Sequence, residues 1–120
     1  MSQLISRSFE RDATVVTYLK TRVETLALAG ITYVRITLEP GWRWSECVGP
    51  ALDMTRCPKH HRGYMLAGRL AVTVDGGDPS EFAAGDVYEF QPGHDAWVVG
   101  NEPVVHLDIV SDETSASGKG

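Results

Sequence analysis

Apolar and polar residues alternate along much of this chain, and this alternation is typical of short β-strands. The clearest example is the segment ITYVRITL at 31–38, where Val34, Ile36 and Leu38 define one apolar face. Six further short apolar segments follow, and turns rich in Gly, Pro, Asn and Asp separate them: 63–67, 69–74, 81–83, 87–90, 96–99 and 104–110. Several short strands at close intervals predict an all-β sandwich or barrel.

The N-terminal part is less regular. Segments 13–19 and 23–28 are predicted as strands, because β-branched residues and the nearby Gly30 disfavour the helix that the spacing over 17–28 would also allow. Residues 1–12 are expected to form an edge strand or a short arm. We therefore divide the chain into N-terminal strands at 1–30, which pack on the barrel or on a dimer partner, a barrel at 31–110, and a small polar tail at 111–120 that is expected to be disordered.

Between the strand at 31–38 and the next strand lies a long segment without clear periodicity. Beyond a turn at Pro40-Gly41, residues 42–47 are predicted to be extended, with two tryptophans on one face and Arg43 and Cys47 on the other. Gly49-Pro50 ends this strand, and residues 51–59 are predicted to form a loop, because they include Pro58 and mix polar with apolar side chains.

Length and charge exclude several classes of protein. With 120 residues the chain has the size of one domain, and its net charge of −5 with scattered Lys and Arg argues against nucleic acid or an anionic membrane as partner. No apolar run approaches the ~20 residues that span a bilayer, and the start lacks the apolar core of a signal peptide. We therefore expect a cytoplasmic protein whose two cysteines are thiols rather than a disulfide.

Two glycine-bounded motifs resemble the signature motifs of the cupin superfamily. The first, G-x5-H-x-H-x(3,4)-E-x6-G, runs from Gly41 to Gly68, with Cys47 at the first histidine position and Gly49 at the second, and with His61 at the glutamate position. The second, G-x5-P-x-G-x2-H-x3-N, begins at Gly85 and passes through Pro92 and Gly93, but Ala96 occupies its histidine position.

More narrowly, the segments GWRWSE, HRGYMLAGRL and PGHDAWVVGNEPVV resemble small bacterial single-domain cupins. The resemblance covers residues 31–110 and implies a jelly-roll barrel, the double-stranded β-helix of RmlC-like proteins. It also implies a homodimer, which would cover edge strands and the apolar N-terminal segments.

Cysteines and histidines that could bind a metal are concentrated in the two motif regions. Two of the four usual cupin ligand positions are substituted and two carry no ligand, but the longer gap before His61 contains Cys57, and His94 lies near the vacant fourth position. The candidate set is therefore Cys47, Cys57, His61 and His94. Thiolate and imidazole favour zinc, with iron or copper as alternatives. A pocket of metal-free thiols and imidazoles, or a disulfide between the two cysteines, would explain the same residues.

Other residues near these motifs suit a small-molecule site. Arg43, Glu46 and Asp95 are candidates for catalysis, by holding a carboxylate or acting as acid or base. Four aromatic side chains are candidates to line the ligand pocket, although packing in the core or at a dimer interface is the simpler interpretation: Trp42, Trp44, Tyr64 and Trp97.

The remaining histidines have two interpretations each. His60 neighbours His61, so the two side chains should point in opposite directions in an extended segment, and His60 is the alternative ligand. His106 shares a strand face with Asp108. The simpler interpretation of this pair is a polar outer face, and the alternative is a hydrogen-bonded pair inside the barrel.

Two functions remain in view from sequence alone. The first is a small metalloenzyme that acts on or binds a small molecule through a Cys- and His-coordinated divalent ion, with oxygenase, isomerase and lyase chemistry all compatible with the fold. The second is a cupin without turnover that senses a metal or ligand, or a scaffold with a degenerate site. No serine elbow or glycine-rich phosphate loop accompanies these residues, so acyl and phosphoryl transfer are not indicated.

Overall fold

A computed structural model describes residues 4–111 of the chain. Most of its regular structure is β-strand, so the all-β prediction is confirmed. The strands are β1 (Thr14–Tyr18), β2 (Thr21–Leu28), β3 (Ile31–Leu38), β4 (His61–Ala67), β5 (Arg69–Val74), β6 (Ser80–Ala83), β7 (Val87–Phe90), β8 (His94–Val98) and β9 (Val104–Ser111). Three single-turn helices complete the fold: α1 (Phe9–Asp12), α2 (Trp44–Cys47) and α3 (Gly49–Leu52). Of the tail predicted at 111–120, Ser111 is the last residue of β9, and the rest lies outside the described residues.

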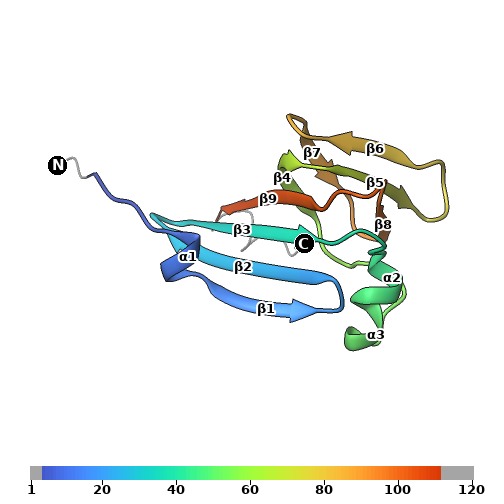
Figure 1. Cartoon of the computed structure of the whole chain (residues 1–120), viewed down its shortest axis with the longest axis horizontal. Helices are drawn as coiled ribbons and strands as arrows, with labels where there is room; N and C mark the ends of the chain where they lie inside the picture. Colours follow the sequence, from blue (N-terminus) through green and yellow to red (C-terminus); the bar gives the residue numbers. More distant parts are fainter. Residues whose placement is uncertain (1–3, 112–120) are drawn as a thin grey trace.

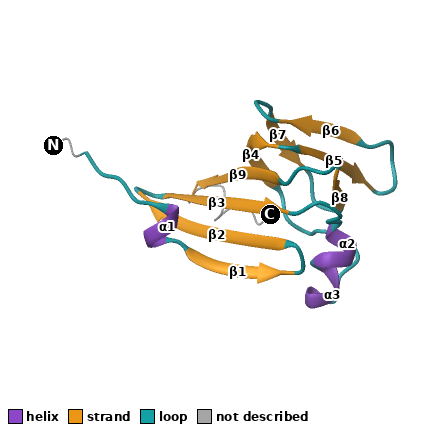
Figure 2. Cartoon of the chain, in the orientation of Figure 1, coloured by secondary structure: helices purple, strands orange, loops and turns teal. Residues whose placement is uncertain are grey.

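The strands form two antiparallel sheets. The larger sheet has the order β1-β2-β3-β9-β4-β7 and the smaller one the order β6-β5-β8 (Figures 1 and 2). Figure 1 shows that β1 and β2 extend away from the smaller sheet, whereas β4, β7 and β9 lie near it. The two strands predicted at 13–19 and 23–28 are thus the first two strands of the larger sheet.

Inward-facing side chains of both sheets make the core. Strand alternation places every second residue of β4, β7 and β9 on the inner face. Four residues are almost completely buried: Leu38, Met65, Leu70 and Val104. Several polar residues of the structure are also buried, namely Thr21, Glu24, His94, Asp95, His106 and Asp108. Buried polar groups must find partners inside the protein, and in the described part of the chain every buried side-chain nitrogen or oxygen has one.

The prediction of a strand over residues 42–47 is wrong for most of that segment. Trp42 and Arg43 do pair with β8, since the Val98 N–H donates to the Trp42 carbonyl and Arg43 bridges to Trp97. From Trp44 onward the chain turns into α2 and then α3. Tertiary contacts decide this local structure, because the Asp95 carboxylate accepts the N–H of the second helical residue. Alternation alone gave no sign of these contacts.

The N-terminal segment also differs from a simple arm. Ser8 caps α1 by accepting the Glu10 N–H at 3.1 Å, and the Arg35 guanidinium lies 4.7 Å above the ring centre of Phe9. The helix is therefore docked on the outer face of the larger sheet. Within residues 4–111, no helix combines the length and apolarity needed to cross a membrane.

Candidate metal centre

Three predicted ligands meet at one end of the two sheets. Cys57 lies in the loop before β4, His61 is the first residue of β4, and His94 is the first residue of β8. Two backbone hydrogen bonds join the loop to β8: Cys57 N–H donates to the His94 carbonyl at 2.9 Å, and Gly93 N–H donates to the Cys57 carbonyl at 2.8 Å. One possible ligand atom from each of the three side chains lies within 4.8 Å of the other two.

The two histidine rings are oriented so that one nitrogen of each stays free of backbone and carboxylate partners. His61 Nδ1 lies 2.6 Å from Asp108 Oδ2, and His94 Nδ1 lies 2.7 Å from the Gln91 carbonyl. Each Nδ1–H is the donor, because the carboxylate and the carbonyl can only accept. The Nε2 atoms are left for another partner, and His61 Nε2 lies 3.4 Å from Cys57 Sγ.

The surroundings of Cys57 favour the deprotonated form of its thiol. Burial raises its pKa, but hydrogen bonds from His61 and His94 lower it more, and the Lys59 backbone N–H adds to them. The net effect brings the pKa down to about 6. A thiolate is the form that binds a metal. Three donors to one sulfur therefore stabilise the charge state that a metal needs.

His61 and Asp108 each stabilise the charged form of the other. Burial lowers the pKa of His61, but the hydrogen bond to Asp108 and the contact with Cys57 raise it to about 10. Burial raises the pKa of Asp108, yet His106 and His61 together hold it well below its usual range. In the metal-free protein the pair is thus an imidazolium and a carboxylate, with the Cys57 thiolate on the other side of the ring.

A hydrogen-bonded network continues behind His61. The Tyr88 hydroxyl donates to Asp108 Oδ1 and lies 2.8 Å from His106 Nδ1. Burial and the neighbouring Asp108 raise the pKa of Tyr88, so it remains a neutral donor. The interpretation of His106 and Asp108 as a polar outer face is therefore wrong, since both are buried. The alternative, a hydrogen-bonded pair inside the barrel, is what the structure contains.

The sequence predicted no role for Asp108 beside the metal ligands, and it predicted Tyr88 to be a core residue with an aromatic pocket wall as the alternative. Strand register explains the association: Gly63 of β4 pairs with Tyr88 on one side and with Asp108 on the other. The inner face that carries His61 therefore also carries both of these side chains. The alternation of His106 and Asp108 was visible in the sequence, but their distance from His61 along the chain hid the contact.

Cys47 lies outside the group of three ligands. It is the last residue of α2 and is buried in the hydrophobic core together with Trp44 and Val48. Its assignment as a ligand remains a prediction. Both cysteines are free thiols, in agreement with the expectation of no disulfide.

His60 points away from His61, as adjacent residues of an extended segment should. Its Nε2 lies 2.6 Å from Glu89 Oε2, and Arg62 donates to the same oxygen at 3.3 Å. Glu89 is exposed, so this pair is on the outer side of the sheet. The alternative of His60 as a ligand has no support in this geometry.

Two of the three catalytic candidates bind each other. Asp95 is buried, and its carboxylate accepts hydrogen bonds from Arg43 Nη1 at 3.2 Å, from Ser45 N–H at 3.0 Å and from Ser45 Oγ at 2.8 Å. Arg43 also stacks 4.3 Å above the Trp97 ring. These contacts fasten α2 to β8. Glu46 is exposed on α2. The catalytic roles of the three residues remain predictions.

The aromatic candidates are dispersed. Trp42 and Trp44 are buried in the core, and the Trp42 indole N–H donates to Thr21 Oγ1 at 2.8 Å. Trp97 supports Arg43, and Tyr64 is exposed on β4. Phe90 is the aromatic residue beside the candidate ligands, with its ring centre 6.2 Å from that of His61 and 5.8 Å from that of His94. Its place opposite His61 follows from the pairing of β4 with β7.

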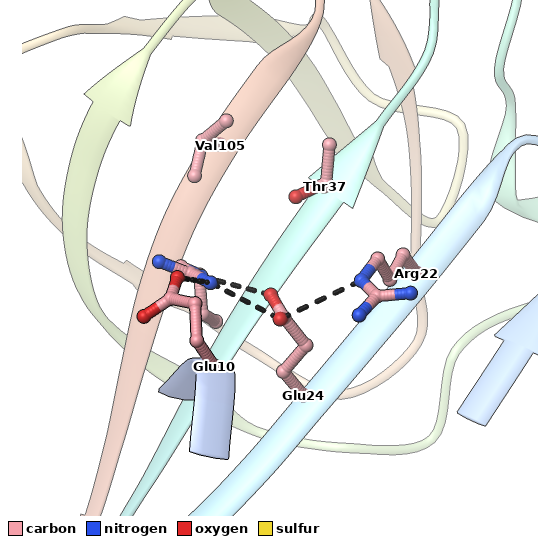
Figure 3. Close-up of a pocket in the computed structure, with 6 residues that line it drawn as sticks. Glu10, Arg22, Glu24, Thr37 and Val105 are labelled. Carbon is pink, nitrogen blue, oxygen red and sulfur yellow. Dashed lines mark hydrogen bonds and ion pairs between the residues drawn. The ribbon is translucent and has the colours of Figure 1, made fainter. Parts of the chain in front are cut away.

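A hollow lies on the outer face of the larger sheet, away from the candidate ligands. Its volume is about 430 Å³, and Figure 3 shows Glu24 on β2 between Arg22 and Glu10 of α1. Arg35 donates to Glu24 at 2.8 and 3.1 Å and to Glu10 at 2.9 Å. The charged groups of this hollow thus bind one another, and the contacts of Arg35 with Glu10 and Phe9 hold α1 against the sheet.

The donor set of Cys57, His61 and His94 fits a divalent metal. A tetrahedral zinc site with typical bond lengths has a sulfur–nitrogen edge of about 3.6 Å, close to the 3.4 Å between Cys57 Sγ and His61 Nε2. Imidazoles whose other nitrogen donates to a carboxylate or a carbonyl are the usual metal-binding form of histidine. Cys57 and His94 are only 4% and 3% exposed, so the group lies in the interior rather than on the surface.

Comparisons with solved structures identify the fold. A protein of unknown function from Vibrio parahaemolyticus matches 82% of this chain and 97% of its own, with a TM-score of 0.61 and 12% identity. An RmlC-like cupin family protein with a double-stranded β-helix fold, from Methanocaldococcus jannaschii, matches 98% of this chain and 99% of its own, with a TM-score of 0.59 and 11% identity.

A larger enzyme contains the same fold. The oxalate decarboxylase of Lactobacillus farciminis, solved as a formate complex, matches 92% of this chain with a TM-score of 0.63 and 19% identity, and this chain spans 34% of its length. No protein-family model matches the sequence, and no curated protein matches it significantly. At these identities the likeness shows the fold alone, and the chain has the double-stranded β-helix fold of RmlC-like cupins.

Proposed function

We propose that this chain is a metal-binding cupin that holds one divalent ion through Cys57, His61 and His94. The observation that carries the proposal is their convergence: a thiol and two imidazoles from three separate segments have ligand atoms within 4.8 Å of one another. The supporting hydrogen bonds leave both Nε2 atoms and the sulfur available. A packed core without a ligand would not need this arrangement.

The donor types favour zinc, with iron or copper as alternatives. One thiolate and two neutral imidazoles match the nitrogen and sulfur ligands of tetrahedral zinc sites. A zinc ion with three protein ligands supplies a Lewis acid with one further position for water or a small molecule. The protein's own contribution is to fix the rings through Asp108 and the Gln91 carbonyl, and to shield the site with Phe90.

The ligand at the further position is proposed to be a small oxygen-donor molecule. Formate is a suitable first probe, because one of the solved structures with this fold is a decarboxylase in complex with formate. The burial of Cys57 and His94 limits the size of a molecule that can approach the metal.

A second candidate function is sensing without turnover. The observation that favours it is the position of the catalytic candidates: Arg43 and Asp95 are bonded to each other, and Glu46 is exposed on α2. In that case binding of a metal would stabilise the fold without transforming a substrate.

Metal analysis of the protein purified without a histidine tag tests the proposal. We expect one equivalent of metal in the wild type and in His60→Ala, which alters the adjacent outward-facing histidine. The Cys57→Ala/His61→Ala double variant should retain less than a tenth of an equivalent. A wild type that binds no zinc in equilibrium dialysis, or a double variant that binds as well as His60→Ala, would refute the proposal.

Cys47→Ala distinguishes three protein ligands from four. Because Cys47 lies outside the group, this variant should keep both its metal and the absorption spectrum of the cobalt-substituted protein. Loss of a thiolate-to-cobalt band would instead make Cys47 a ligand. A change in the cobalt spectrum on addition of formate would show an open position and favour the first function. An unchanged spectrum would favour sensing.

A further inference from the structure

We propose that Asp108 is a positioning residue for the metal centre, and that Tyr88 and His106 hold its carboxylate in place for this task. The inference rests on the proposed function, and extends it to side chains that contact no metal ligand except His61. It assigns a purpose to the three buried polar groups behind the candidate site, Tyr88, His106 and Asp108.

The two carboxylate oxygens of Asp108 have different partners. Oδ2 accepts the His61 Nδ1–H at 2.6 Å, and Oδ1 accepts the hydroxyl of Tyr88. His106 Nδ1 lies 2.8 Å from the Tyr88 oxygen and 3.4 Å from Asp108 Oδ1. With donors on both oxygens, the carboxylate can neither rotate nor move without breaking a hydrogen bond in a region that water does not reach.

The network has a fixed direction. Tyr88 gives its only proton to Asp108, so its oxygen must accept, and His106 Nδ1–H is the donor to it. Asp108 accepts from both sides and therefore demands a proton on His61 Nδ1. Nε2 of His61 faces Cys57, so it is the nitrogen that would give up its proton and offer a lone pair when a metal binds.

The outer face of the same sheet supplies a natural comparison. His60 and Glu89 also lie 2.6 Å apart, but the Glu89 side chain is about half exposed and no candidate ligand surrounds the pair. The inner pair, His61 and Asp108, has the same separation, and its carboxylate side chain is only 7% exposed. The two histidine–carboxylate pairs have the same separation but differ in burial. Removing the carboxylate charge from each pair in turn therefore separates the effect of its position beside the ligands from the effect of the charge itself.

The experiment compares zinc affinity, by competition with a chromophoric chelator, in the wild type, Asp108→Asn, Tyr88→Phe and Glu89→Gln. Loss of a carboxylate partner of a metal-binding histidine typically weakens binding about 10- to 100-fold. We expect a loss of this size in Asp108→Asn, a smaller loss in Tyr88→Phe and none in Glu89→Gln. Saturating cobalt should give Asp108→Asn an altered absorption spectrum, which a purely structural defect would not produce.

The outcomes separate the inference from the proposed function. If the wild type binds zinc and Asp108→Asn binds it as tightly with the wild-type cobalt spectrum, Asp108 is not a positioning residue, and the metal site stands without it. If the wild type binds no zinc, both proposals fail. If Asp108→Asn does not fold, Tyr88→Phe decides alone, because it removes one hydroxyl and leaves the carboxylate: reduced affinity supports the network, and unchanged affinity overturns it.

Discussion

Cys57 Sγ lies 3.4 Å from His61 Nε2, so in the metal-free protein the two side chains form a thiolate–imidazolium pair. The pair is partly shielded from water, since Cys57 is buried and the His61 side chain is 18% exposed. The state of the thiol can be read directly, because a thiolate absorbs in the ultraviolet and a thiol does not.

The first prediction is an ultraviolet titration of metal-free protein. Hydrogen bonds from His61 and His94 outweigh burial and bring the Cys57 pKa to about 6, so the thiolate absorbance should appear near pH 6. The Cys57→Ala variant still contains Cys47, and it should lack this step. Absorbance that develops only above pH 8 in the wild type would contradict the geometry.

The second prediction concerns stability between pH 6.5 and 9. The ordinary pKa values are 6.5 for histidine and 9.0 for cysteine, so an unfolded chain in this range carries a neutral imidazole and a neutral thiol. The folded pair carries an imidazolium and a thiolate, which together hold the same number of protons. Folding then takes up no net proton at this pair, and its contribution to the free energy of unfolding does not change with pH.

Cys57→Ala breaks this balance. Asp108 still raises the pKa of His61, so the folded variant holds one proton more than the unfolded chain just above pH 6.5. Stability gained in this way is fully present below pH 6.5 and is lost as pH rises, by at most about 1.4 kcal/mol per pH unit. Denaturant unfolding of metal-free wild type and variant should give curves that diverge upward from pH 6.5. Parallel curves would show that the His61 pKa is ordinary.

The sequence was sufficient for the fold and for most of the candidate ligands. Alternation in segments such as 31–38 reflects burial on one face of a strand, which depends on local spacing alone, and the strand appears there as β3. Cys57 and His61 lie four residues apart, so their proximity also had a local cause. His94 joined them because the resemblance to cupins placed the two motif regions at one site.

Other features depended on contacts that spacing does not encode. Cys47 was grouped with the ligands because it occupies the first histidine position of the first cupin motif, but hydrogen bonds from Ser45 to Asp95 accompany a turn of the chain into α2. The helix leaves Cys47 in the core. Asp108 was recognised as a possible partner of His106, whereas its contact with His61 follows from the pairing of β4 with β9, which no local pattern reports.

The third prediction follows from the close approach of β4 and β9. A Cβ atom on Gly63 would stand 1.8 Å from the Leu107 carbonyl oxygen and 2.7 Å from the Tyr88 hydroxyl oxygen. Gly63→Ala must therefore separate the two strands and displace Tyr88, which supports Asp108. Overpacking of this kind costs about 1–3 kcal/mol, and we expect zinc affinity to fall as well. Thermal unfolding of the metal-free protein and chelator competition would measure the two effects.

Gly76→Ala is the matched control for Gly63→Ala. Gly76 has φ of +72° and no atom near the position of an added Cβ, so alanine there meets backbone strain but no clash. The cost should be about 1–2 kcal/mol, typical of a left-handed conformation for a residue other than glycine, with zinc affinity unchanged. Equal zinc affinities in the two variants would show that the spacing of β4 and β9 does not govern the site.

The fourth prediction concerns the charged anchor on the outer face of the sheet. Glu24 is 4% exposed, and Arg35 supplies two hydrogen bonds to its carboxylate. Arg35→Met leaves this carboxylate with only the 3.5 Å contact to Arg22. Removing one partner of a fully buried ion pair costs about 3–5 kcal/mol, and the partial exposure of Arg35 reduces this to about 1–3 kcal/mol. Arg69→Met breaks an exposed pair with Glu81 and should cost less than about 1 kcal/mol.

Acid should reduce the difference between wild type and Arg35→Met. The Arg35 hydrogen bonds hold the pKa of Glu24 below its ordinary value of 4.5, so this interaction stabilises the fold above that pH and is lost as pH falls. In the variant, burial without Arg35 favours the protonated carboxyl, so acid relieves the unpaired charge instead. Denaturant unfolding at pH 7 and at pH 4 should therefore show a smaller gap in unfolding free energy at the lower pH. A gap that stays constant or widens would mean that Arg35 acts through its packing on Phe9 rather than through the charge of Glu24.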